Sequence, residues 1–371
     1  YHLIFIVKIK NIMKVCILGC SLSALTLARA LVNQNIYVDL LCKKEKFNLN
    51  KSRTIGISKS NVEFFNNDII NINNLIWKLK KIEIFSDNLE KEKLLNFENN
   101  GKQLFSIVKN YELYETLEKS LIKDKKFKKK KISNKNLSLV KKYEFIINCD
   151  YFNDITKKYF SKKIIKEYKS FAYTTTIKHK KISNNTATQI FTKVGPLAFL
   201  PISNVETSVV YSVHNLLGTN KVDIDKMIRS NNIKYEIIEI NKIDSFELKS
   251  LSLRSYYHDN ILAFGDLLHR VHPLAGQGFN MTIRDTKILT EIITKRNNLG
   301  LPIDSSVSFE FENASKHKNF IFSNGVDLIY EFFNSERKNK SKVLSKSVQF
   351  FGKIPYLNKM FTKIADKGIL F

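Results

Sequence analysis

The stretch Gly265–Asp285, "GDLLHRVHPLAGQGFNMTIRD", combines turn residues with polar side chains directly before a helical pattern. Only 12 glycines occur among the 371 residues, and three of them fall in this stretch. The apolar run 261–264 before it predicts a β-strand. After the turn from Pro273 to Gly278, Met281, Ile288 and Ile292 recur at helical spacing. A strand, a glycine-rich turn and a helix in this order predict a backbone that closely approaches a ligand at the edge of a sheet.

Two parts of this stretch have the chemistry that a flavin needs. Asp266, directly after the strand, places a carboxylate where it can accept hydrogen bonds from sugar-alcohol hydroxyls. Gly276 and Gly278 let backbone N–H groups approach a ring closely. The positive end of the following helix can stabilise the negative charge that develops on a flavin ring when it is reduced. The residues therefore favour a flavin site built around this turn.

The two histidines of the stretch have alternative interpretations. His269 and His272 are candidate catalytic residues by position alone, and structural hydrogen bonding is the alternative for both. No metal site is expected from this pair, because Pro273 and the glycines interrupt the helix that would align the two rings.

A βαβ pattern precedes this stretch near the start of the chain. Its first turn is where a dinucleotide pyrophosphate would bind, at a helix N-terminus. The glycine motif expected there is reduced to Gly19, Ser21 and Ala24, so it is weak evidence alone. The acid expected after the second strand, for the adenosine ribose, is replaced by Cys42. The predicted elements are a strand over 15–18, a helix over 24–31 and a strand over 36–40.

The basic charge has two explanations. The formal net charge is +26 and the isoelectric point is near 9.7. An anionic partner would explain it, but the lysines are spread along the whole chain. The one dense run, "KDKKFKKKK" over 123–131, is expected to be a solvated helix end or loop, without the interleaved aromatics of a nucleic-acid surface. No nucleic-acid partner is expected.

Cysteine spacing indicates a protein of a reducing compartment, and hydropathy indicates that the chain does not span a membrane. The four cysteines form no C-x-x-C pair, so neither a disulfide framework nor a zinc site is expected. No apolar run reaches the roughly 18 residues that a membrane span needs, which predicts a soluble or peripheral protein. Residues 1–12 are expected to be an extension, because Met13 precedes the first strand.

At Gly265–Asp285 the chain resembles the second flavin motif of the class A flavoprotein aromatic hydroxylases, and within them the ubiquinone-biosynthesis hydroxylases. Other matching segments are "SRTIGISKSNVEFF" (52–65), "TTTIKH" (174–179), "GPLAFLPI" (195–202) and "FSNGVDLIYEFF" (322–333). The motif positions that match are Gly265, Asp266, His269, His272, Pro273, Ala275, Gly276, Gln277, Gly278, Asn280 and Asp285.

The resemblance implies further cofactor contacts and shows departures. Arg53 matches an arginine that contacts the flavin, and Asp150 matches the acid of an Asp-Gly motif linked to flavin and nicotinamide binding. Tyr151 replaces the glycine of that motif, and Tyr111 replaces an arginine. The implied cofactor-binding residues are Gly19, Ser21, Ala24, Arg53, Asp150, Gly265, Asp266, Pro273, Gly276, Gln277, Gly278 and Asn280.

The implied fold is α/β: a Rossmann-like FAD-binding domain, an inserted antiparallel-sheet substrate domain and a C-terminal helical tail. Short alternating strands with turns between 188 and 213 support the antiparallel sheet. The expected FAD-binding segments are 13–66, 98–160 and 255–298, the substrate domain is 67–97 and 161–254, and the helical region is 299–371.

The implied activity is hydroxylation of the aromatic ring of a polyprenylated phenol in ubiquinone biosynthesis. NADPH or NADH would reduce FAD, and molecular oxygen would react through a flavin C4a-hydroperoxide. Two alternatives are open: a flavin-binding, non-catalytic member of a quinone-biosynthesis assembly, and a different flavoenzyme of the same fold. Other quinone-biosynthesis proteins are candidate partners. The expected location is cytoplasmic, with peripheral contact at the inner membrane as one interpretation of the tail that follows Lys346.

Overall fold

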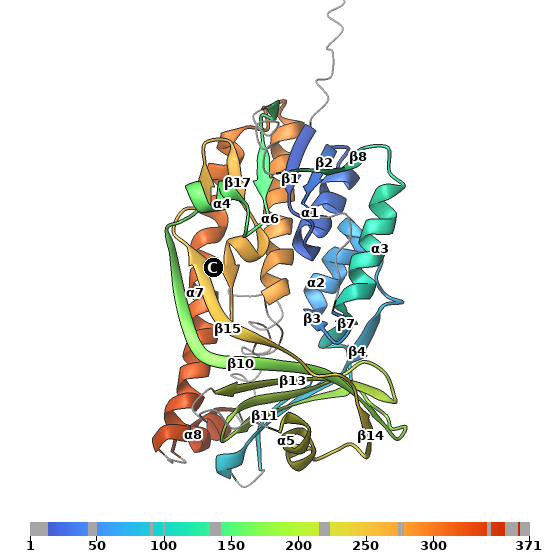
Figure 1. The fold of residues 1–371 in the computed structure, drawn as a ribbon, viewed down its shortest axis with the longest axis vertical. Coiled ribbons are helices and arrows are strands. Elements are labelled where there is room, and N and C mark those ends of the chain that lie inside the picture. The colour runs from blue at the N-terminus through green and yellow to red at the C-terminus, as the bar shows by residue number, and fades with distance from the viewer. Residues whose placement is uncertain are drawn as a thin grey trace, which may run out of the picture.

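The computed structural model describes residues 14–43, 50–89, 92–98, 101–133, 142–214, 223–273, 276, 278–339, 343–352 and 363. Figure 1 shows a parallel sheet with its helices at one end and a large, mainly antiparallel sheet across the other end. The long helix α7 (Ser305–Asn339) runs along one side of the molecule, past both sheets. The predicted α/β class with a second sheet and C-terminal helices is confirmed.

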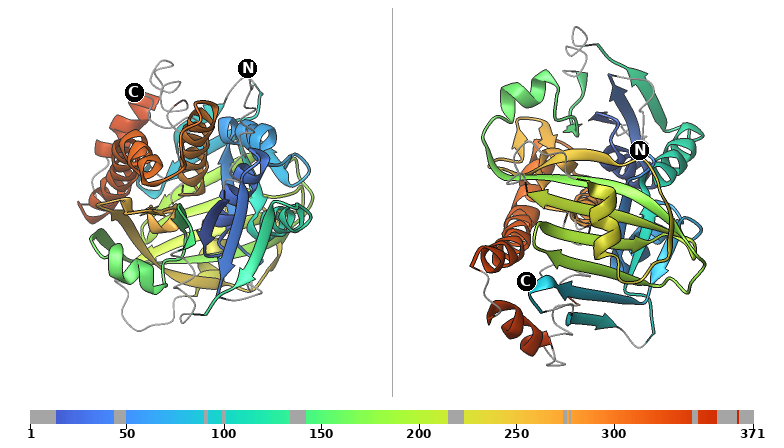
Figure 2. Two further views of the ribbon diagram at one scale, coloured as in Figure 1. Left: turned by 90° about the horizontal axis from the view of Figure 1, so that it is seen from above. Right: turned by 60° about the horizontal axis from the view of Figure 1, so that its bottom comes forward.

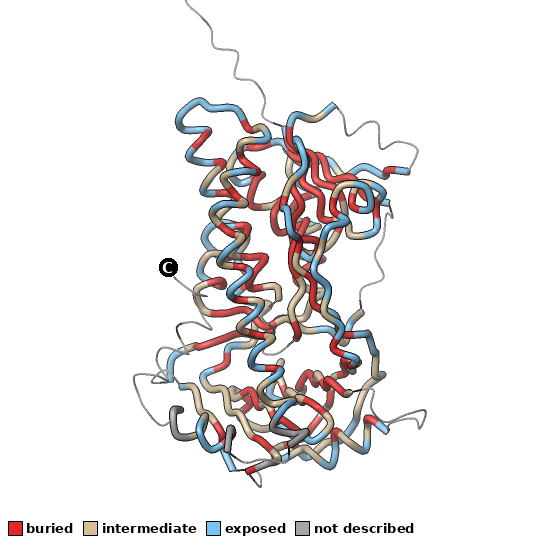
Figure 3. Tube along the Cα trace, turned by 90° about the vertical axis from the view of Figure 1, so that its left-hand side faces the viewer, coloured by how far each residue is buried: buried red, intermediate tan, exposed pale blue. Residues whose placement is uncertain are grey.

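The parallel sheet has the strand order β16-β17-β9-β1-β2-β8, in which only β16 runs antiparallel to its neighbour. Its central strands are buried nearly throughout, because helices and the rest of the core cover both faces. Figure 3 shows this buried core as the red segments of the upper half. The strands are β1 (Lys14–Leu18), β2 (Tyr37–Cys42), β8 (Phe127–Lys131), β9 (Ile146–Asn148), β16 (Tyr257–His258) and β17 (Ile261–Ala263).

Helices pack on this sheet as the apolar spacing predicts. The strand, helix and strand expected over 15–40 are confirmed as β1, α1 (Leu22–Asn33) and β2. Helix α1 contacts α3 (Asn110–Ile122) and α6 (Gly278–Asn298), and most of its residues are buried. The helix predicted after the glycine-rich turn is α6. The remaining helices of this half are α2 (Lys59–Phe64), a π-helical turn (Phe65–Ile69) and α4 (Asp154–Tyr159).

The lysine-rich run over 123–131 corrects one expectation. It is neither a helix end nor a loop beyond its first residues, because Phe127–Lys131 forms β8, the edge strand beside β2. Phe127 is buried against the core, and the backbone finds hydrogen-bond partners along β2. The lysines tolerate this position because an edge strand leaves most of its side chains in water.

The second sheet is built on long strands with alternating burial. Its strand order is β18-β15-β10-β13-β12-β11-β5-β6, with β14 also paired to β10. All pairs are antiparallel except β5 with β11. Helix α5 (Ile224–Asn231) lies across one face, as Figure 2 shows. The strands are β5 (Lys81–Ser86), β6 (Lys93–Glu98), β10 (Lys163–His179), β11 (Thr186–Thr192), β12 (Gly195–Pro201), β13 (Glu206–His214), β14 (Ile237–Ile240), β15 (Asp244–Leu253) and β18 (His269–Arg270).

A small sheet joins the two halves. It consists of β3 (Thr54–Ser58), β7 (Phe105–Lys109) and β4 (Ile76–Leu79), in the order β3-β7-β4. Hydroxyl contacts tie it to the large sheet: Ser52 donates to Asp244 over 3.1 Å and Thr54 donates to Ser208 over 2.8 Å. Of the segment expected to start the substrate domain, β4 pairs within this small sheet, whereas β5 and β6 join the large one. The domain bounds stay a prediction.

The C-terminal part contains α7 and α8 (Val343–Gly352). Helix α7 contacts α6, β16, β17 and β18, and α8 contacts β6. Among the described helices, none is both long and apolar enough to cross a membrane.

Candidate cofactor site at the carboxyl edge of the parallel sheet

Three turns meet where the parallel strands end. β17, β9 and β1 are neighbours, so the residues that follow them, Gly265, Asp150 and Gly19, share one edge of the sheet. A Cβ on Gly19 would lie 3.1 Å from both the Cβ and the backbone nitrogen of Asp150. Gly19 also has a φ of +99°, a conformation that L side chains rarely adopt. The close approach of these turns therefore depends on glycine.

The N-terminus of α1 points its positive end at this edge. Ser21 is the N-cap residue, and its hydroxyl accepts a hydrogen bond from the backbone N–H of Ala24 over 3.2 Å. No acidic residue lies in the first turn of the helix to neutralise the helix dipole. Ser21 thus replaces the usual glycine with a helix cap, and the loop keeps the electrostatics that suit an anionic pyrophosphate.

Two carboxylates flank the same buried residue at this edge. Burial raises the pKa of the Cys149 thiol, and the negative charges of Asp266 and Asp150 raise it further. Asp150 accepts a hydrogen bond from the N–H of Phe152 over 2.8 Å, which fixes its own turn. Asp266 is exposed. These carboxylates can accept hydrogen bonds from hydroxyl groups of a bound ligand.

Tyr151, which stands where a glycine is usual, lies between two cations. The Lys163 ammonium donates to its hydroxyl over 2.8 Å and sits 4.4 Å from the ring centroid. The Arg270 guanidinium lies 4.3 Å from the same centroid. Contacts with β10 and β18 therefore accommodate the bulk of the ring locally.

The glycine-rich turn is fixed by one buried amide side chain. Asn280, at the start of α6, accepts hydrogen bonds from the Ser58 N–H (2.9 Å) and the Asn61 side chain (2.8 Å). It also donates to the carbonyl of Gly56 over 3.0 Å. Gly276 has a φ of +62°, and a Cβ there would lie 3.3 Å from the Gly56 nitrogen. Asn280 thus binds the start of α6 to β3 and sets the path of the turn.

The other predicted residues of this turn are partly described. Pro273 is half-buried before the turn, and Gly278 is the first residue of α6. Gln277 lies outside the described residues.

Arg53 lies at the junction between the small sheet and the large one. Its side chain is exposed, and the guanidinium lies 5.2 Å from the ring centroid of Phe246 on β15. Its carbonyl accepts the N–H of Asn110 at the start of α3. The structure therefore places Arg53 at the seam between the two halves.

His269 is held in a buried hydrogen-bond chain. Its Nε2 lies 2.6 Å from Oδ2 of Asp285, and Asn319 donates to Oδ1 of the same carboxylate over 2.9 Å. All three side chains are buried. This chain connects β18, α6 and α7, which is the structural alternative foreseen for His269.

His272 occupies an aromatic enclosure. It is 1% exposed, and its ring lies 4.9 Å from Tyr168 and 4.4 Å from Tyr330 between centroids. Neither ring nitrogen has a hydrogen-bond partner among the described residues. Burial, and then the positive charges of His214 and Lys166, lower the pKa of His272 to about 3. The imidazole is therefore neutral at pH 7.

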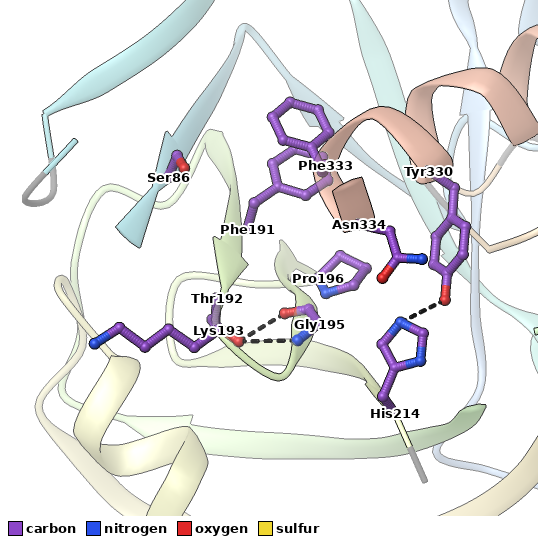
Figure 4. Close-up of a pocket in the computed structure, with 10 residues that line it drawn as sticks. All are labelled: Ser86, Phe191, Thr192, Lys193, Gly195, Pro196, His214, Tyr330, Phe333 and Asn334. Carbon is purple, nitrogen blue, oxygen red and sulfur yellow. Dashed lines mark hydrogen bonds between the residues drawn. The ribbon is translucent and has the colours of Figure 1, made fainter. Parts of the chain in front are cut away.

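Sequence reasoning missed a pocket next to this enclosure. Figure 4 shows it as a small, partly open pocket between the β11–β13 strands and α7. The Tyr330 hydroxyl lies 2.7 Å from Nε2 of His214, and Ser170 lies 3.1 Å from Nδ1. Phe191 and Phe333 stack beside them. No local motif signals this group, because its members are far apart in the chain.

Sequence reasoning also missed a cysteine pair, and the expectation of no disulfide is wrong. Cys20 and Cys42 form a disulfide with a Cα–Cα distance of 5.7 Å. The reason is topological: β1 and β2 pair in parallel with Leu18 opposite Leu41, so Cys20, in the turn after β1, lies beside Cys42, the last residue of β2. A separation of 22 residues conceals this proximity in the sequence.

Comparison with known proteins agrees with this geometry. Residues 221–297 match the model of an FAD-binding domain family. The chain is 24% identical over 225 residues to the mitochondrial ubiquinone biosynthesis monooxygenase COQ6 of Danio rerio, covering 50% of this chain and 46% of that protein. It is 27% identical over 154 residues to the 3-demethoxyubiquinol 3-hydroxylase of Escherichia coli, covering 40% and 39%. The chain thus spans less than half the length of these curated relatives.

Solved structures share the fold over nearly the whole chain. The p-nitrophenol 4-monooxygenase PnpA of Pseudomonas putida matches with a TM-score of 0.77 at 9% identity, covering 96% of this chain and 99% of that one. HpxO of Klebsiella pneumoniae, complexed with FAD and uric acid, matches with a TM-score of 0.71 at 11% identity, covering 96% and 97%.

The fold is therefore that of the FAD-dependent monooxygenases. The FAD-binding domain match over 221–297 runs from α5 and β15 of the large-sheet half through β17 of the parallel sheet to α6. The resemblance to the class A hydroxylases, and to those of ubiquinone biosynthesis among them, is confirmed by these relatives and structural neighbours.

Proposed function

We propose that the chain binds FAD without covalent attachment along the carboxyl edge of the parallel sheet. The observation that carries this proposal is the meeting of Gly19, Asp150 and Gly265 at that edge. Gly19 and Gly265 both have positive φ, and an added Cβ would lie 3.1 Å from Asp150 and 2.7 Å from Ser23, as expected where backbone approaches a ligand closely. The match to an FAD-binding domain over 221–297 supports the same cofactor.

In this proposal the predicted residues divide into groups that meet different parts of the cofactor. The α1 N-terminus, with Gly19, Ser21 and Ala24, receives the pyrophosphate. Asp266 and Asp150 accept hydrogen bonds from ligand hydroxyls. Gly276 and Gly278 present backbone donors to the flavin ring, with Pro273 and Gln277 as further proposed contacts, and Asn280 fixes the start of α6 to β3.

The proposed reaction is hydroxylation of the ring of a polyprenylated phenol in ubiquinone biosynthesis. Bound FAD would supply the chemistry, taking up a hydride from NADPH or NADH and activating molecular oxygen. The chain's own part is to position the ring of the substrate and to exclude water. The similarity to two ubiquinone-biosynthesis hydroxylases supports this substrate class.

The environment of His272 fits a part of such a site from which water is excluded. It directly precedes the proposed flavin turn, is almost fully buried and is neutral at pH 7. A neutral ring beside the reaction centre adds no charge that would favour water there. His269 is bonded to Asp285 instead, so its role in the proposal is to hold β18 against α6 and α7.

Two alternatives differ from this proposal in what they turn over. A non-catalytic flavin-binding member of a quinone-biosynthesis assembly would bind FAD and show no substrate-dependent oxygen uptake. A different flavoenzyme of the same fold would be reduced by NAD(P)H and act on another substrate. The departures at Ser21 and Tyr151 motivate the first alternative.

Peripheral contact with a membrane at its cytoplasmic face is part of the proposal. A hydrophobic substrate and a net charge of +26 would favour binding of the protein to an anionic bilayer surface. Most of the tail after Lys346 lies outside the described residues. Binding to anionic vesicles at low salt, by chains with and without the residues after Lys346, tests this point. Equal binding by both chains would assign the contact to another surface.

The decisive experiment measures bound flavin and catalytic turnover on the purified chain. We expect a yellow protein that releases FAD on denaturation, and NAD(P)H oxidation with oxygen uptake that a prenylated phenol accelerates. Product analysis by mass spectrometry should show one added oxygen atom. Colourless protein that added FAD cannot reconstitute would contradict FAD binding. Flavin-loaded protein without phenol-dependent uptake would favour the non-catalytic alternative.

A further inference from the structure

The disulfide between Cys20 and Cys42 lies inside the proposed nucleotide unit. Cys20 follows Gly19 in the turn between β1 and α1, and Cys42 is the last residue of β2. The N–H of Gly19 also donates to the carbonyl of Leu41 over 2.9 Å, so the turn rests on the end of β2. The Cα–Cα distance of 5.7 Å is in the ordinary range for a disulfide.

These two positions are the ones that meet the adenosine half of a dinucleotide. In this type of βαβ unit the first turn carries the pyrophosphate, and an acid at the end of the second strand holds the ribose. Here the acid is absent, and Cys42 is bonded to the phosphate turn instead. The covalent bond therefore connects the two parts of the chain that FAD would contact at its adenosine end.

We propose that Cys20 and Cys42 form a redox-active pair whose disulfide holds the phosphate turn in its FAD-binding form, so that the dithiol protein binds FAD more weakly. This inference rests on the proposed function, because it concerns the affinity of the same site for its cofactor.

Burial of the pair determines the direction of the effect. Cys20 is 2% exposed and Cys42 is 1% exposed, so the sulfur atoms lie beneath the turn, within the core, and do not project into the space for a ligand. The bond thus leaves the ligand space open and restrains the backbone above it. Without the bond, the turn that contains Gly19 has more conformational freedom. More conformational entropy is then lost when FAD binds, which weakens the affinity for FAD.

The chemistry requires a two-electron oxidant, for which we name a peroxide. Two thiols and one hydrogen peroxide molecule give one disulfide and two water molecules; both thiol protons and two electrons pass to the peroxide oxygens. A small dithiol reverses the reaction by exchange, releases both cysteines as thiols and becomes a cyclic disulfide itself.

The two other cysteines provide an internal comparison. Cys16 and Cys149 are buried free thiols. Burial, and then the charge of Asp39, raise the pKa of Cys16 to about 12, and burial also raises the pKa of Cys149. Neither is joined to a second sulfur in the structure, unlike Cys20 and Cys42, so both should still be counted as thiols after the pair is oxidised.

The first measurement is a thiol count on the full chain. After treatment with hydrogen peroxide, alkylation in denaturant followed by mass spectrometry should label two cysteines, with peptides showing Cys20 joined to Cys42. After reduction with a dithiol, all four should be labelled. Four labelled cysteines after peroxide treatment would overturn the proposal.

The second measurement compares FAD affinity in the two states. We expect the dissociation constant to rise roughly tenfold on reduction, a change that corresponds to restraining one or two residues. The Cys20→Ser and Cys42→Ser chains should both bind FAD as weakly as reduced wild type and show no redox dependence. The matched control is Cys16→Ala, which removes a buried thiol from β1 and should keep the redox dependence of wild type.

The outcomes separate this inference from the proposed function. Equal affinity in both states, or tighter binding by the dithiol form, would overturn the inference while leaving FAD binding intact. Absence of FAD binding in both states would overturn the proposed function and this inference together, although the thiol count would still establish whether the bond forms.

Discussion

A Cβ placed on Gly265 would lie 2.7 Å from the Cβ of Ser23, closer than real side chains approach. Gly265 follows β17 and Ser23 lies in the first turn of α1, so two segments more than 240 positions apart in sequence press together at the cofactor edge. The absence of a side chain at Gly265 thus lets the end of β17 and the N-terminus of α1 share one site.

Gly265→Ala tests this contact. We expect the free energy of unfolding in urea to fall by about 2–4 kcal/mol, because the clash adds to the strain of a φ of +65°. FAD affinity should fall as well. The matched control is Gly300→Ala, which has a φ of +68° and nothing within 4 Å of its added Cβ, and should lose about 1 kcal/mol. If both variants lose the same stability, the contact with Ser23 is unimportant.

Asp266→Ala tests the proposed hydroxyl acceptor. The loss of charge-assisted hydrogen bonds should weaken FAD binding by roughly 1.5–3 kcal/mol, with little effect on stability because the side chain is exposed. Fluorescence titration of the apoprotein with FAD measures the change. Asp225→Ala on α5 removes an exposed carboxylate that pairs with Arg229 of the same helix and should leave affinity unchanged. Wild-type affinity in Asp266→Ala would remove this residue from the site.

The buried His272 predicts a pH dependence of stability. Its pKa of about 3 lies below the ordinary value of 6.5, so the unfolded chain binds the proton more readily between these values. The contribution of His272 to the free energy of unfolding should therefore be fully present above pH 6.5 and decrease as the pH drops toward 3. At pH 5 the free energy of unfolding should be lower by about 2 kcal/mol. His272→Leu, of similar volume, should remove this component when urea unfolding is compared at pH 7 and pH 5. An unchanged slope would show that His272 is protonated in the fold.

Tyr151→Gly tests whether the departure from the Asp-Gly motif matters for reduction. Because Lys163 and Arg270 hold the ring, we expect the substitution to lower stability by about 1 kcal/mol. Anaerobic stopped-flow reduction of bound flavin by NADPH or NADH should change by less than twofold. Tyr151→Phe keeps the ring contacts, loses the Lys163 hydrogen bond, and serves as the control. A large gain in reduction rate in the glycine variant would show that the tyrosine obstructs the nicotinamide.

Local pattern was enough to predict the first strand–helix–strand unit and the strand–turn–helix around Gly265–Gly278, because both depend on periodicity and turn residues within short windows. It failed for the run over 123–131, where lysines conceal an edge strand. There the pairing partner β2, more than 80 residues earlier, determines the structure.

The partners of individual side chains could not be predicted from the sequence either, because they also depend on segments that are distant in the chain. The motif identified His269 and His272 as a pair, yet one is bonded to Asp285 and the other is enclosed by Tyr168 and Tyr330. Cysteine spacing argued against a disulfide, and the parallel pairing of β1 with β2 produced one.

The sequence by itself determined the elements that carry the cofactor motif and the residue types available there. Only the tertiary structure decided which of them meet: the Gly19 turn with Asp150, Gly265 with Ser23, Asn280 with β3, and Cys20 with Cys42. The physical reason is that strand and helix signals are local, whereas these contacts arise from the order and register in which distant strands pair.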